Sequence, residues 1–374
     1  MKRPLKQYTR ECGLRNKTQE NIPVYSVTNS HGFVPSTDYF SKEVYSKDLS
    51  NYKIVSRGMI AYNPSRVNVG SLAVQNAEDK VIVSPLYVVF SVDESELMPE
   101  YVSYFLHSER GIKEIVAHTS GSVRDSLKFS ALQDIEINIC SLNEQAHIVS
   151  LLQKIERIIE KRRLVLVKID DLVKSQFIEM FGDIVRNEKK WPCESVEQVA
   201  PAVPYKGQIA SSDGKFWLLN LDMVEAQTGE VISKVMVEPT EIGNSTTTFD
   251  RGNVLYSKLR PYLNKVVIPT ESGYSTSELL PLRPNPGKLN RYYFASALRS
   301  DAFVGYIQEK VAGAKMPRVS MGVFRAFRIP CPPMLLQEQF ARFVEQTDKS
   351  KFRIKQSLEK LETLYKALLQ KYFG

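Results

Sequence analysis

Two long stretches of the chain carry an apolar stripe with helical spacing. From Asn143 to Phe181, and again from Met334 to Phe373, there is neither glycine nor proline. In the first stretch, apolar residues recur at steps of three and four, with two polar interruptions: Ile148, Leu152, Ile155, Ile159, Arg162, Leu166, Ile169, Val173, Gln176 and Met180. In the second stretch the same steps connect Ile354, Leu358, Leu361, Tyr365, Leu368 and Tyr372. These heptad seams predict two helices of about 38 residues, each about 55 Å long.

An apolar seam needs a partner, since a lone helix would expose it to water. The simplest partner is the other long helix of the same chain. The alternative is that each helix packs on its own neighbouring domain. Gly182 follows the first helix at the place where a helix stop is expected, and the second helix runs to Gly374.

The segment before each long helix has a different pattern, with short apolar runs separated by turn residues. Strands are predicted at residues 81–83, 87–90, 253–256 and 265–268, and short helices at residues 99–110 and 290–300. Each such segment is therefore expected to form an α/β domain of about 140 residues. The predicted order is a first domain at 1–142, a central helix at 143–182, a second domain at 183–334 and a C-terminal helix at 335–374.

The two halves of the chain repeat one another. Arg57, Gly58, Tyr62 and Arg66 match Arg251, Gly252, Tyr256 and Arg260 at one offset of 194 residues. Weaker matches follow in the same order: Tyr25–Asn29 with Leu218–Asp222, Leu106–Ser108 with Leu298–Ser300, Leu142–Gln145 with Leu336–Gln339, and Phe181–Gly182 with Phe373–Gly374. A conserved order at nearly constant offset indicates a duplicated unit.

The amino-acid composition limits the possible partners, metal sites and location of the protein. Lys and Arg outnumber Asp and Glu by 50 to 42, a mild excess that favours a polyanionic partner bound through local patches. The four cysteines stand alone, so neither a zinc site nor a disulfide framework is expected. The N-terminus shows no signal peptide, and no apolar run is long enough to span a membrane. A cytoplasmic protein with reduced thiols is the expectation.

Four motifs together resemble the specificity subunits of type I restriction–modification enzymes. They are residues 63–71 (Asn-Pro-Ser-Arg-Val-Asn-Val-Gly-Ser), residues 121–124 (Gly-Ser-Val-Arg), the Leu-x-Glu-Gln helix starts, and Phe181-Gly182-Asp183. The resemblance covers essentially the whole chain. The second repeat departs from the first, with Ser257-Lys258-Leu259-Arg260 and residues 313–318 in the corresponding places. The two domains are therefore expected to recognise different sequences.

This resemblance implies a fold and a mechanism. The fold is a mixed α/β architecture, with two duplicated target-recognition domains separated by two long conserved helices packed as an antiparallel coiled coil. Each domain would read one half of a split target in double-stranded DNA. Two modification subunits would dock on the helices and methylate adenine N6 with S-adenosylmethionine, and restriction subunits would use ATP and magnesium. The chain itself would hold no cofactor and catalyse nothing.

Two other classes of protein would require different sequence features. A stand-alone DNA methyltransferase needs an (Asn/Asp/Ser)-Pro-Pro-(Tyr/Phe) segment, whereas Pro332-Pro333 lies between Cys331 and Met334. The sequence also lacks a P-loop, and its four histidines, His31, His107, His118 and His147, have no metal-ligand spacing. The third class is a coiled-coil scaffold that binds only protein, and the cationic and amide residues at the repeated turns argue against it.

Candidate DNA contacts are the side chains in the repeated turns that can pair with base edges or phosphates. In the first domain they are Asn63, Ser65, Arg66, Asn68, Ser122, Arg124 and Lys128. In the second domain they are Tyr256, Ser257, Lys258, Arg260, Lys315, Arg318 and Ser320. Asn63-Pro64-Ser65 is also a good turn sequence, so these residues could instead only shape the backbone. Because Arg66 and Arg260 recur in domains of different specificity, phosphate contact is the favoured role for both.

Overall fold

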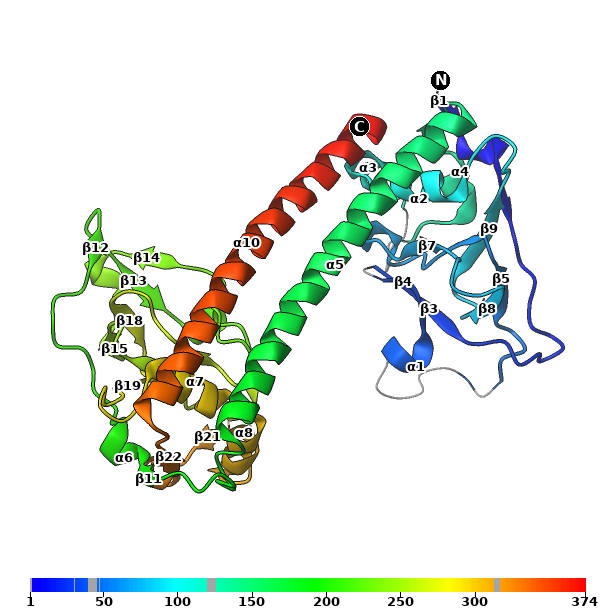
Figure 1. Cartoon of the computed structure of the whole chain (residues 1–374). Helices are drawn as coiled ribbons and strands as arrows, with labels where there is room; N and C mark the ends of the chain where they lie inside the picture. Colours follow the sequence, from blue (N-terminus) through cyan, green and yellow to red (C-terminus); the bar gives the residue numbers. More distant parts are fainter. Residues whose placement is uncertain (1, 30, 40–45, 47, 120–125, 313–316) are drawn as a thin grey trace. The chain divides into compact units, whose positions relative to one another are not determined.

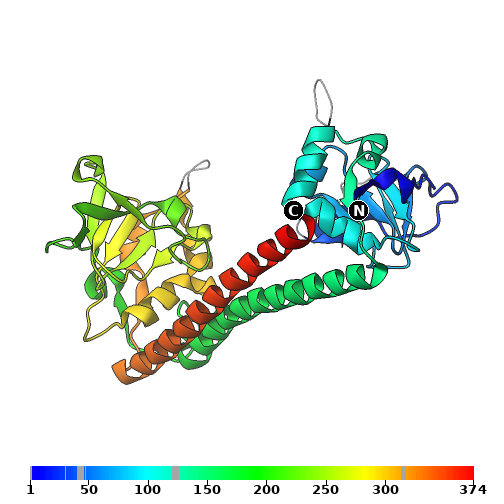
Figure 2. The same cartoon turned by 90° about the horizontal axis from the view of Figure 1, so that it is seen from above.

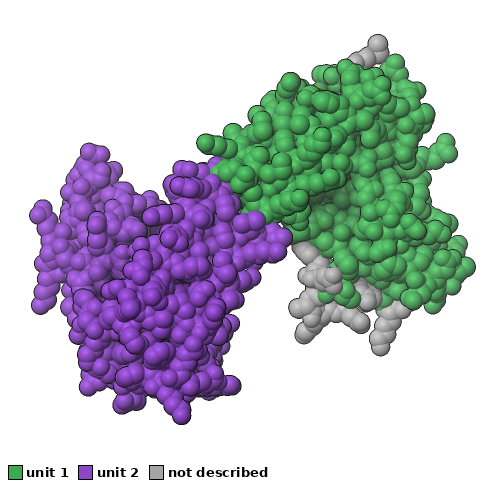
Figure 3. All heavy atoms as spheres, in the orientation of Figure 1, with its two compact units in different colours: residues 1–162, 357–374 green, residues 163–356 purple. Residues whose placement is uncertain are grey.

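The computed structural model describes residues 2–29, 31–39, 46, 48–119, 126–312 and 317–374. The chain divides into two compact units, residues 1–162 with 357–374, and residues 163–356 (Figure 3). Both long helices are present: α5 spans Leu142–Phe181 and α10 spans Met334–Phe373 (Figure 1). Each helix contributes one part to each unit, because the division crosses α5 after Arg162 and α10 after Gln356. Among the described residues, no helix combines the length and apolar character that crossing a membrane requires.

The first unit is built around a four-stranded antiparallel sheet in the order β2-β9-β6-β7, with three additional strand pairs, β1-β10, β3-β4 and β5-β8. Its strands are β1 (Lys2–Pro4), β2 (Thr9–Glu11), β3 (Tyr25–Thr28), β4 (Gly32–Pro35), β5 (Lys53–Ser56), β6 (Ile60–Tyr62), β7 (Leu72–Val74), β8 (Lys80–Val83), β9 (Val88–Val92) and β10 (Glu136–Asn138). Its helices besides α5 and α10 are η1 (Leu5–Gln7), α1 (Ser36–Tyr39), η2 (Val67–Val69), α2 (Pro99–His107), α3 (Glu109–His118) and α4 (Phe129–Gln133).

The second unit has a five-stranded sheet, in which β12-β13-β18-β15 form a path and β14 also pairs with β13, and a three-stranded sheet β17-β16-β19. Its strands are β11 (Cys193–Ser195), β12 (Ser211–Ser212), β13 (Lys215–Leu219), β14 (Val235–Val237), β15 (Thr246–Phe249), β16 (Val254–Ser257), β17 (Val266–Val267), β18 (Gly273–Thr276), β19 (Leu279–Leu282), β20 (Val311–Ala312), β21 (Arg318–Val319) and β22 (Arg328–Pro330). Its helices besides α5 and α10 are α6 (Val196–Val199), η3 (Leu221–Met223), η4 (Pro239–Glu241), η5 (Pro261–Leu263), α7 (Arg291–Arg299), α8 (Asp301–Gln308) and α9 (Met321–Ala326).

The sequence repeat corresponds to a repeat of strand pairing. In the first unit β6 pairs antiparallel with β7 and β9, and in the second unit β16 pairs antiparallel with β17 and β19. The outer pair β1-β10 has its counterpart in β11-β22. The helix pair α2 and α3 corresponds in the same way to α7 and α8. The predicted strands and short helices are therefore confirmed, except that the helix predicted at 99–110 is two helices that meet at Ser108, and the duplication is confirmed as well.

One short repeated motif, Leu106–Ser108 and Leu298–Ser300, has a simple physical role. Ser108 is the N-cap of α3, and its Oγ accepts a hydrogen bond from the Gly111 N–H at 3.1 Å. Ser300 is the N-cap of α8, and its Oγ accepts from the Phe303 N–H at 3.3 Å. Serine satisfies an N–H group that would otherwise lack a partner at the start of a helix. The repeat therefore preserves the break between two short helices.

The start of α5 is anchored by a buried glutamine, Gln145, whose side chain is fully inaccessible. Its Oε1 accepts from the Met98 N–H at 2.9 Å. Its Nε2 donates to the carbonyl oxygens of Glu96 and Cys140, both at 2.9 Å. The amide thus satisfies three backbone groups that come from two separate segments of the domain.

Gln337 does the same at the start of α10, and it is equally buried. Its Oε1 accepts from the Asn290 N–H at 2.8 Å, and its Nε2 donates to the carbonyl oxygens of Lys288 and Pro332 at 2.9 and 2.7 Å. Each of these positions lies 192 residues after its counterpart around Gln145. The Leu-x-Glu-Gln motif is therefore a device that fixes each long helix to the domain preceding it.

Removing this amide is expected to destabilise the second unit. Gln337→Ala leaves three buried backbone groups without partners, which should lower the free energy of unfolding by about 3 kcal/mol. Both tryptophans, Trp191 and Trp217, belong to this unit, so urea unfolding followed by tryptophan fluorescence reports on it. The matched control is Gln339→Ala, because Gln339 is exposed on the same helix turn. An equal loss in both variants would contradict the anchoring role.

The predicted seams are the protected sides of both helices. In α5, Ile148, Leu152, Ile155 and Ile159 are buried, whereas Ile158 is 43% exposed. In α10, all six seam residues from Ile354 to Tyr372 are partly protected.

The two helices run antiparallel within each unit, as the contacts between them show. Tyr365 donates from its hydroxyl to Glu156 Oε1 at 2.6 Å in the first unit. Lys351 donates to Asp170 Oδ1 at 2.6 Å in the second unit. Later residues of α5 therefore face earlier residues of α10, and the antiparallel coiled coil is confirmed.

The ends of the helices also pack into the domains, so the alternative interpretation holds for part of each helix. In the second unit, the Phe181 ring lies 4.6 Å from the Tyr293 ring and 5.5 Å from the Phe340 ring, centroid to centroid. In the first unit, the Phe373 ring lies 5.0 Å from the Tyr101 ring, and the C-terminal end of α10 lies beside α2 (Figure 2). Each domain core is thus completed by the last turn of a long helix.

Candidate nucleic-acid interface

The turn after β6 presents the first group of predicted contact residues. Asn63 uses its side chain to hold this turn, since its Oδ1 accepts from the Ser65 N–H at 3.1 Å. Its carbonyl oxygen accepts from the Arg66 N–H at 3.0 Å. Asn63 therefore shapes the backbone, as its turn-forming sequence suggested. The side chains of Ser65, Arg66 and Asn68 are exposed on this braced turn.

The second predicted segment of the first unit lies directly against this turn. Leu127 donates its N–H to the Pro64 carbonyl oxygen at 3.0 Å, and the buried Tyr62 donates its hydroxyl to the Leu127 carbonyl oxygen at 3.1 Å. Lys128 follows as an exposed residue at the start of α4. A pocket of about 580 Å³, lined in part by Pro64, Lys128 and Phe129, lies at this junction. Ser122 and Arg124 lie outside the described residues.

The second unit repeats this junction by an equivalent hydrogen bond. Val319 donates its N–H to the Lys258 carbonyl oxygen at 3.0 Å, which corresponds to the Leu127–Pro64 bond. A second bond joins the Arg260 N–H to the Pro317 carbonyl oxygen at 2.8 Å, and Leu259 forms a β-bridge with Arg318. In each unit, the two segments that contain the candidate DNA contacts are about 60 residues apart in the sequence, and these hydrogen bonds bring them together. Lys315 lies outside the described residues.

Arg260 has an unusual backbone conformation for a residue with a side chain. Its φ is 49°, in the left-handed region that disfavours residues other than Gly, Asn and Asp. It precedes the short helix η5, and its side chain is exposed. Backbone strain of this kind clusters at functional sites, although strain alone does not identify one.

Two candidates in the second unit require correction. Tyr256 is 5% exposed, and its ring stacks on Phe324 at 4.7 Å between centroids. Ser257 is 3% exposed, and its hydroxyl donates to the Leu259 carbonyl oxygen at 2.9 Å. All four residues of β16 are buried, because this strand is covered on both faces. Neither side chain can reach a DNA duplex without unfolding the strand, so neither is retained as a contact.

The remaining candidates of the second unit that the structure describes are at least partly accessible. Ser320 is exposed at the start of α9, and its side chain makes no capping bond there. Lys258 is half-buried. Arg318 is exposed and forms an ion pair with Glu278, at 2.9 Å between Nη2 and Oε1. Glu278 was not expected from the sequence, since nothing in its local pattern points to a partner 40 residues away.

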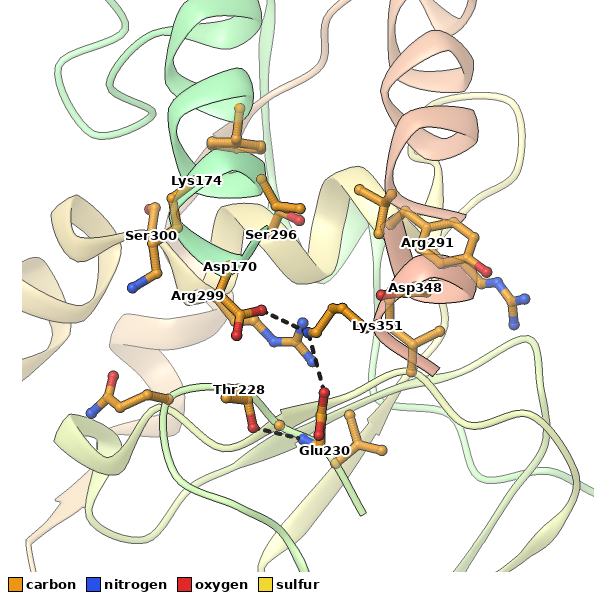
Figure 4. Close-up of a pocket in the computed structure, with 18 of the residues that line it drawn as sticks. Asp170, Lys174, Thr228, Glu230, Arg291, Ser296, Arg299, Ser300, Asp348 and Lys351 are labelled. Atoms are coloured by element: carbon orange, nitrogen blue, oxygen red, sulfur yellow. Dashed lines mark hydrogen bonds and ion pairs between the residues drawn. The ribbon is translucent and has the colours of Figure 1, made fainter. Parts of the chain in front are cut away.

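A charged cluster lies in a separate cavity of the second unit, between the long helices and the 227–231 loop (Figure 4). The cavity has a volume of about 1070 Å³. Lys351 lies between two carboxylates, 2.6 Å from Asp170 and 3.1 Å from Glu230, and Lys355 also pairs with Glu230. Asp170 is half-buried as well as ion-paired.

The protonation of this cluster supports a structural role. Burial acts to lower the pKa of Lys351, but its hydrogen bond to Asp170 and the charge of Asp170 outweigh burial and raise that pKa. Burial acts to raise the pKa of Glu230, but the hydrogen bond from Lys355 and the charges of both lysines lower it. Lys351 and Glu230 therefore both remain charged, and their ion pairs hold the loop of the domain against α10 and α5. Among the residues that the structure describes, no group of three or more His, Cys, Asp or Glu side chains could hold a metal ion.

Comparison with known proteins gives concordant matches. The family model for the type I restriction modification DNA specificity domain matches residues 11–168. A curated relative, the type I restriction enzyme EcoDI specificity subunit of Escherichia coli, is 23% identical over 154 residues, or 40% of this chain. That match covers 34% of the length of the relative.

Two solved structures share the fold over the whole chain. The S subunit of a type I restriction–modification system from M. genitalium has a TM-score of 0.60 at 14% identity, covering 100% of this chain and 96% of the other. A chain of a type I R-M system, from a study of complex assembly and conformational transition, has a TM-score of 0.53 at 14% identity, covering 100% of this chain and 97% of the other. At such low identity these two matches establish the fold alone.

Proposed function

We propose that this chain, which belongs to the family of type I restriction–modification specificity subunits, selects the DNA sequence on which partner subunits act and catalyses no reaction itself. The observation that carries this proposal is the repeated junction. Each unit brings two distant segments together by an equivalent backbone hydrogen bond and leaves polar and cationic side chains exposed there. Two similar junctions with different side chains suit a split target whose halves differ in sequence.

The exposed side chains divide by their chemistry. Arg66 and Arg260 occupy equivalent places just before the short helices η2 and η5, and both are exposed. A cation that recurs in both units suits a feature that both half-sites share, the phosphate backbone. The residues that differ between the units are the ones expected to contact bases. Those residues are Ser65, Asn68, Ser320 and Arg318.

Partner subunits would dock on the long helices. Away from its seam, α5 carries apolar residues that remain half or more exposed, including Leu164 at 52%, Val167 at 57%, Leu172 at 50% and Ile178 at 60%. Exposed apolar side chains gathered on one segment of a helix cost free energy in water and are typical of a surface that a partner covers. In the proposal these partners are two modification subunits that bind S-adenosylmethionine, with restriction subunits that use ATP and magnesium.

The test of the function is a division of labour. The purified chain is expected to bind duplex DNA without methylating or cleaving it. With modification subunits it should direct adenine methylation to one split sequence, mapped by sequencing the methylated adenines. The quickest check is to measure binding of S-adenosylmethionine to the isolated chain, which is expected not to bind it. Methyl transfer by the chain alone would refute the proposal and favour a stand-alone methyltransferase.

A further inference from the structure

Arg318 is held from the side by a carboxylate. Its Nη2 lies 2.9 Å from Glu278 Oε1, and its Nε lies 3.5 Å from Glu278 Oε2. The Glu278 carbonyl oxygen also accepts from the Lys258 N–H at 2.9 Å. Glu278 thus joins the turn before β19 to both segments of the junction. The arginine side chain is 51% exposed and the glutamate side chain 24% exposed, so part of the guanidinium still faces solvent.

The other cations of the two junctions are different. Within the part of the chain that the structure describes, no ion pair to Arg66, Lys128, Lys258 or Arg260 is found. In these four residues no acid of the described chain offsets the positive charge or fixes the direction of the side chain. Among the junction cations that the structure describes, Arg318 is therefore the one whose charge is offset by an acid and whose orientation is restricted.

Net positive charge and fixed orientation of a cation matter for different parts of DNA. Phosphate binding depends on net positive charge and tolerates many orientations of a flexible side chain. The O6 and N7 atoms of a guanine are uncharged acceptors, and pairing with both requires a guanidinium at a defined angle. A carboxylate beside an arginine weakens phosphate binding and fixes the angle of the free N–H groups.

We propose that Glu278 is a positioning residue that makes Arg318 a reader of one guanine in the half-site of the second unit. The inference rests on the proposed function, and it names the base that this junction recognises. The strand registers make β9 and β19 equivalent at an offset of 192 residues, so the position equivalent to Glu278 in the first unit is Leu86 and the first unit has no acid there. The guanine contact is accordingly specific to the second half-site.

The experiment selects bound sequences from a randomised duplex pool with the full chain, and then measures affinity against salt. Arg318→Ala should relax one G·C position of the second half-site, with discrimination there falling about tenfold or more. Glu278→Gln should relax the same position, because the guanidinium loses its fixed angle. It should also strengthen binding to unrelated DNA and steepen the salt dependence by about one unit of slope, because a cation is released toward phosphate.

Three further variants separate positioning from charge and from folding. Arg318→Lys keeps the charge without the planar fork and should relax the same position. Glu238→Gln removes an acid from another surface ion pair of this unit, with Lys215 at 3.4 Å, and should change no position of the target. Arg260→Ala should weaken binding to all sequences about equally.

Two results would distinguish a failure of the positioning role from a failure of the proposed function. If Glu278→Gln keeps every sequence preference of the unsubstituted chain, or weakens binding to all sequences alike, the positioning role is overturned while the proposed function stands. If the unsubstituted chain, with and without modification subunits, selects no sequence at all, the proposed function itself fails.

Discussion

Replacing residues 183–333 with the matching domain of another family member is expected to change one half of the recognised sequence and leave the other half unchanged. The physical reason is that the two domains have separate cores. The main core of the second unit consists only of residues between Phe177 and Val344. The main core of the first unit consists of residues from Leu5 to Leu152 together with Phe373. A new second domain therefore leaves every buried contact of the first domain in place.

The contacts between the second domain and the long helices also determine which donor domains will fit. Phe177, Phe181 and Phe340 stay behind on the helices and need an aromatic partner such as Tyr293, whose ring stacks 5.7 Å from that of Phe177. Gln337 stays behind as well and needs the backbone groups around residues 288–290. A donor that keeps Tyr at position 293 should fold. A donor with a small residue there should leave a cavity, at a cost of about 3–5 kcal/mol.

The measurement is the map of methylated adenines in cells that carry the chimaera and the modification subunits. The matched control exchanges the first domain and should alter the opposite half-site. A change in both half-sites from a single exchange would show that the domains read DNA jointly.

The repeat, both long helices and the seam positions could be predicted because their causes are local or periodic. Gly182 ends α5 with a φ of 76°, and Ser108 and Ser300 cap short helices, all within a few residues of chain. The prediction for the α5 seam is correct even at its two polar positions, because Arg162 and Gln176 are half-buried as well. Periodicity records which face of a helix is covered.

The sequence could not predict which residues of a short strand are covered on both faces. Tyr256 and Ser257 belong to a strand of four residues, which is too short for alternation to distinguish the faces. The ion pairs of Arg318 with Glu278 and of Asp170 with Lys351 join residues 40 and 181 positions apart. Such partners are set by tertiary packing, and no local pattern specifies them.

The boundary between the two units indicates where the chain can be lengthened. It crosses α5 after Arg162 and α10 after Gln356, two points that lie within two residues of equivalence in the repeat, whose offset along the long helices is 192. An insertion before Leu142 would instead displace Gln145 and Ile148 from the first domain. Insertions at the two boundary points leave both domain cores and both glutamine anchors intact.

Four residues inserted at each boundary point are expected to widen the unread spacer between the half-sites by one or two base pairs. Four residues lengthen a helix by about 6 Å at 1.5 Å per residue. Duplex DNA rises about 3.4 Å per base pair. The hypothesis is that the paired helices set the separation of the half-sites, and the readout is the methylated-adenine motif of the variant.

Helical phase provides the matched control, because two inserted residues change length less but orientation more. Four residues turn a helix by about 400°, which leaves the seam within about 40° of its original direction. Two residues at the same points turn it by about 200° and direct the seam residues beyond the insertion, such as Leu166 and Ile169, toward water. The two-residue variant should therefore lose folding or methylation altogether. An unchanged spacer in a folded, active four-residue variant would show that the distance between the half-sites does not depend on the helices.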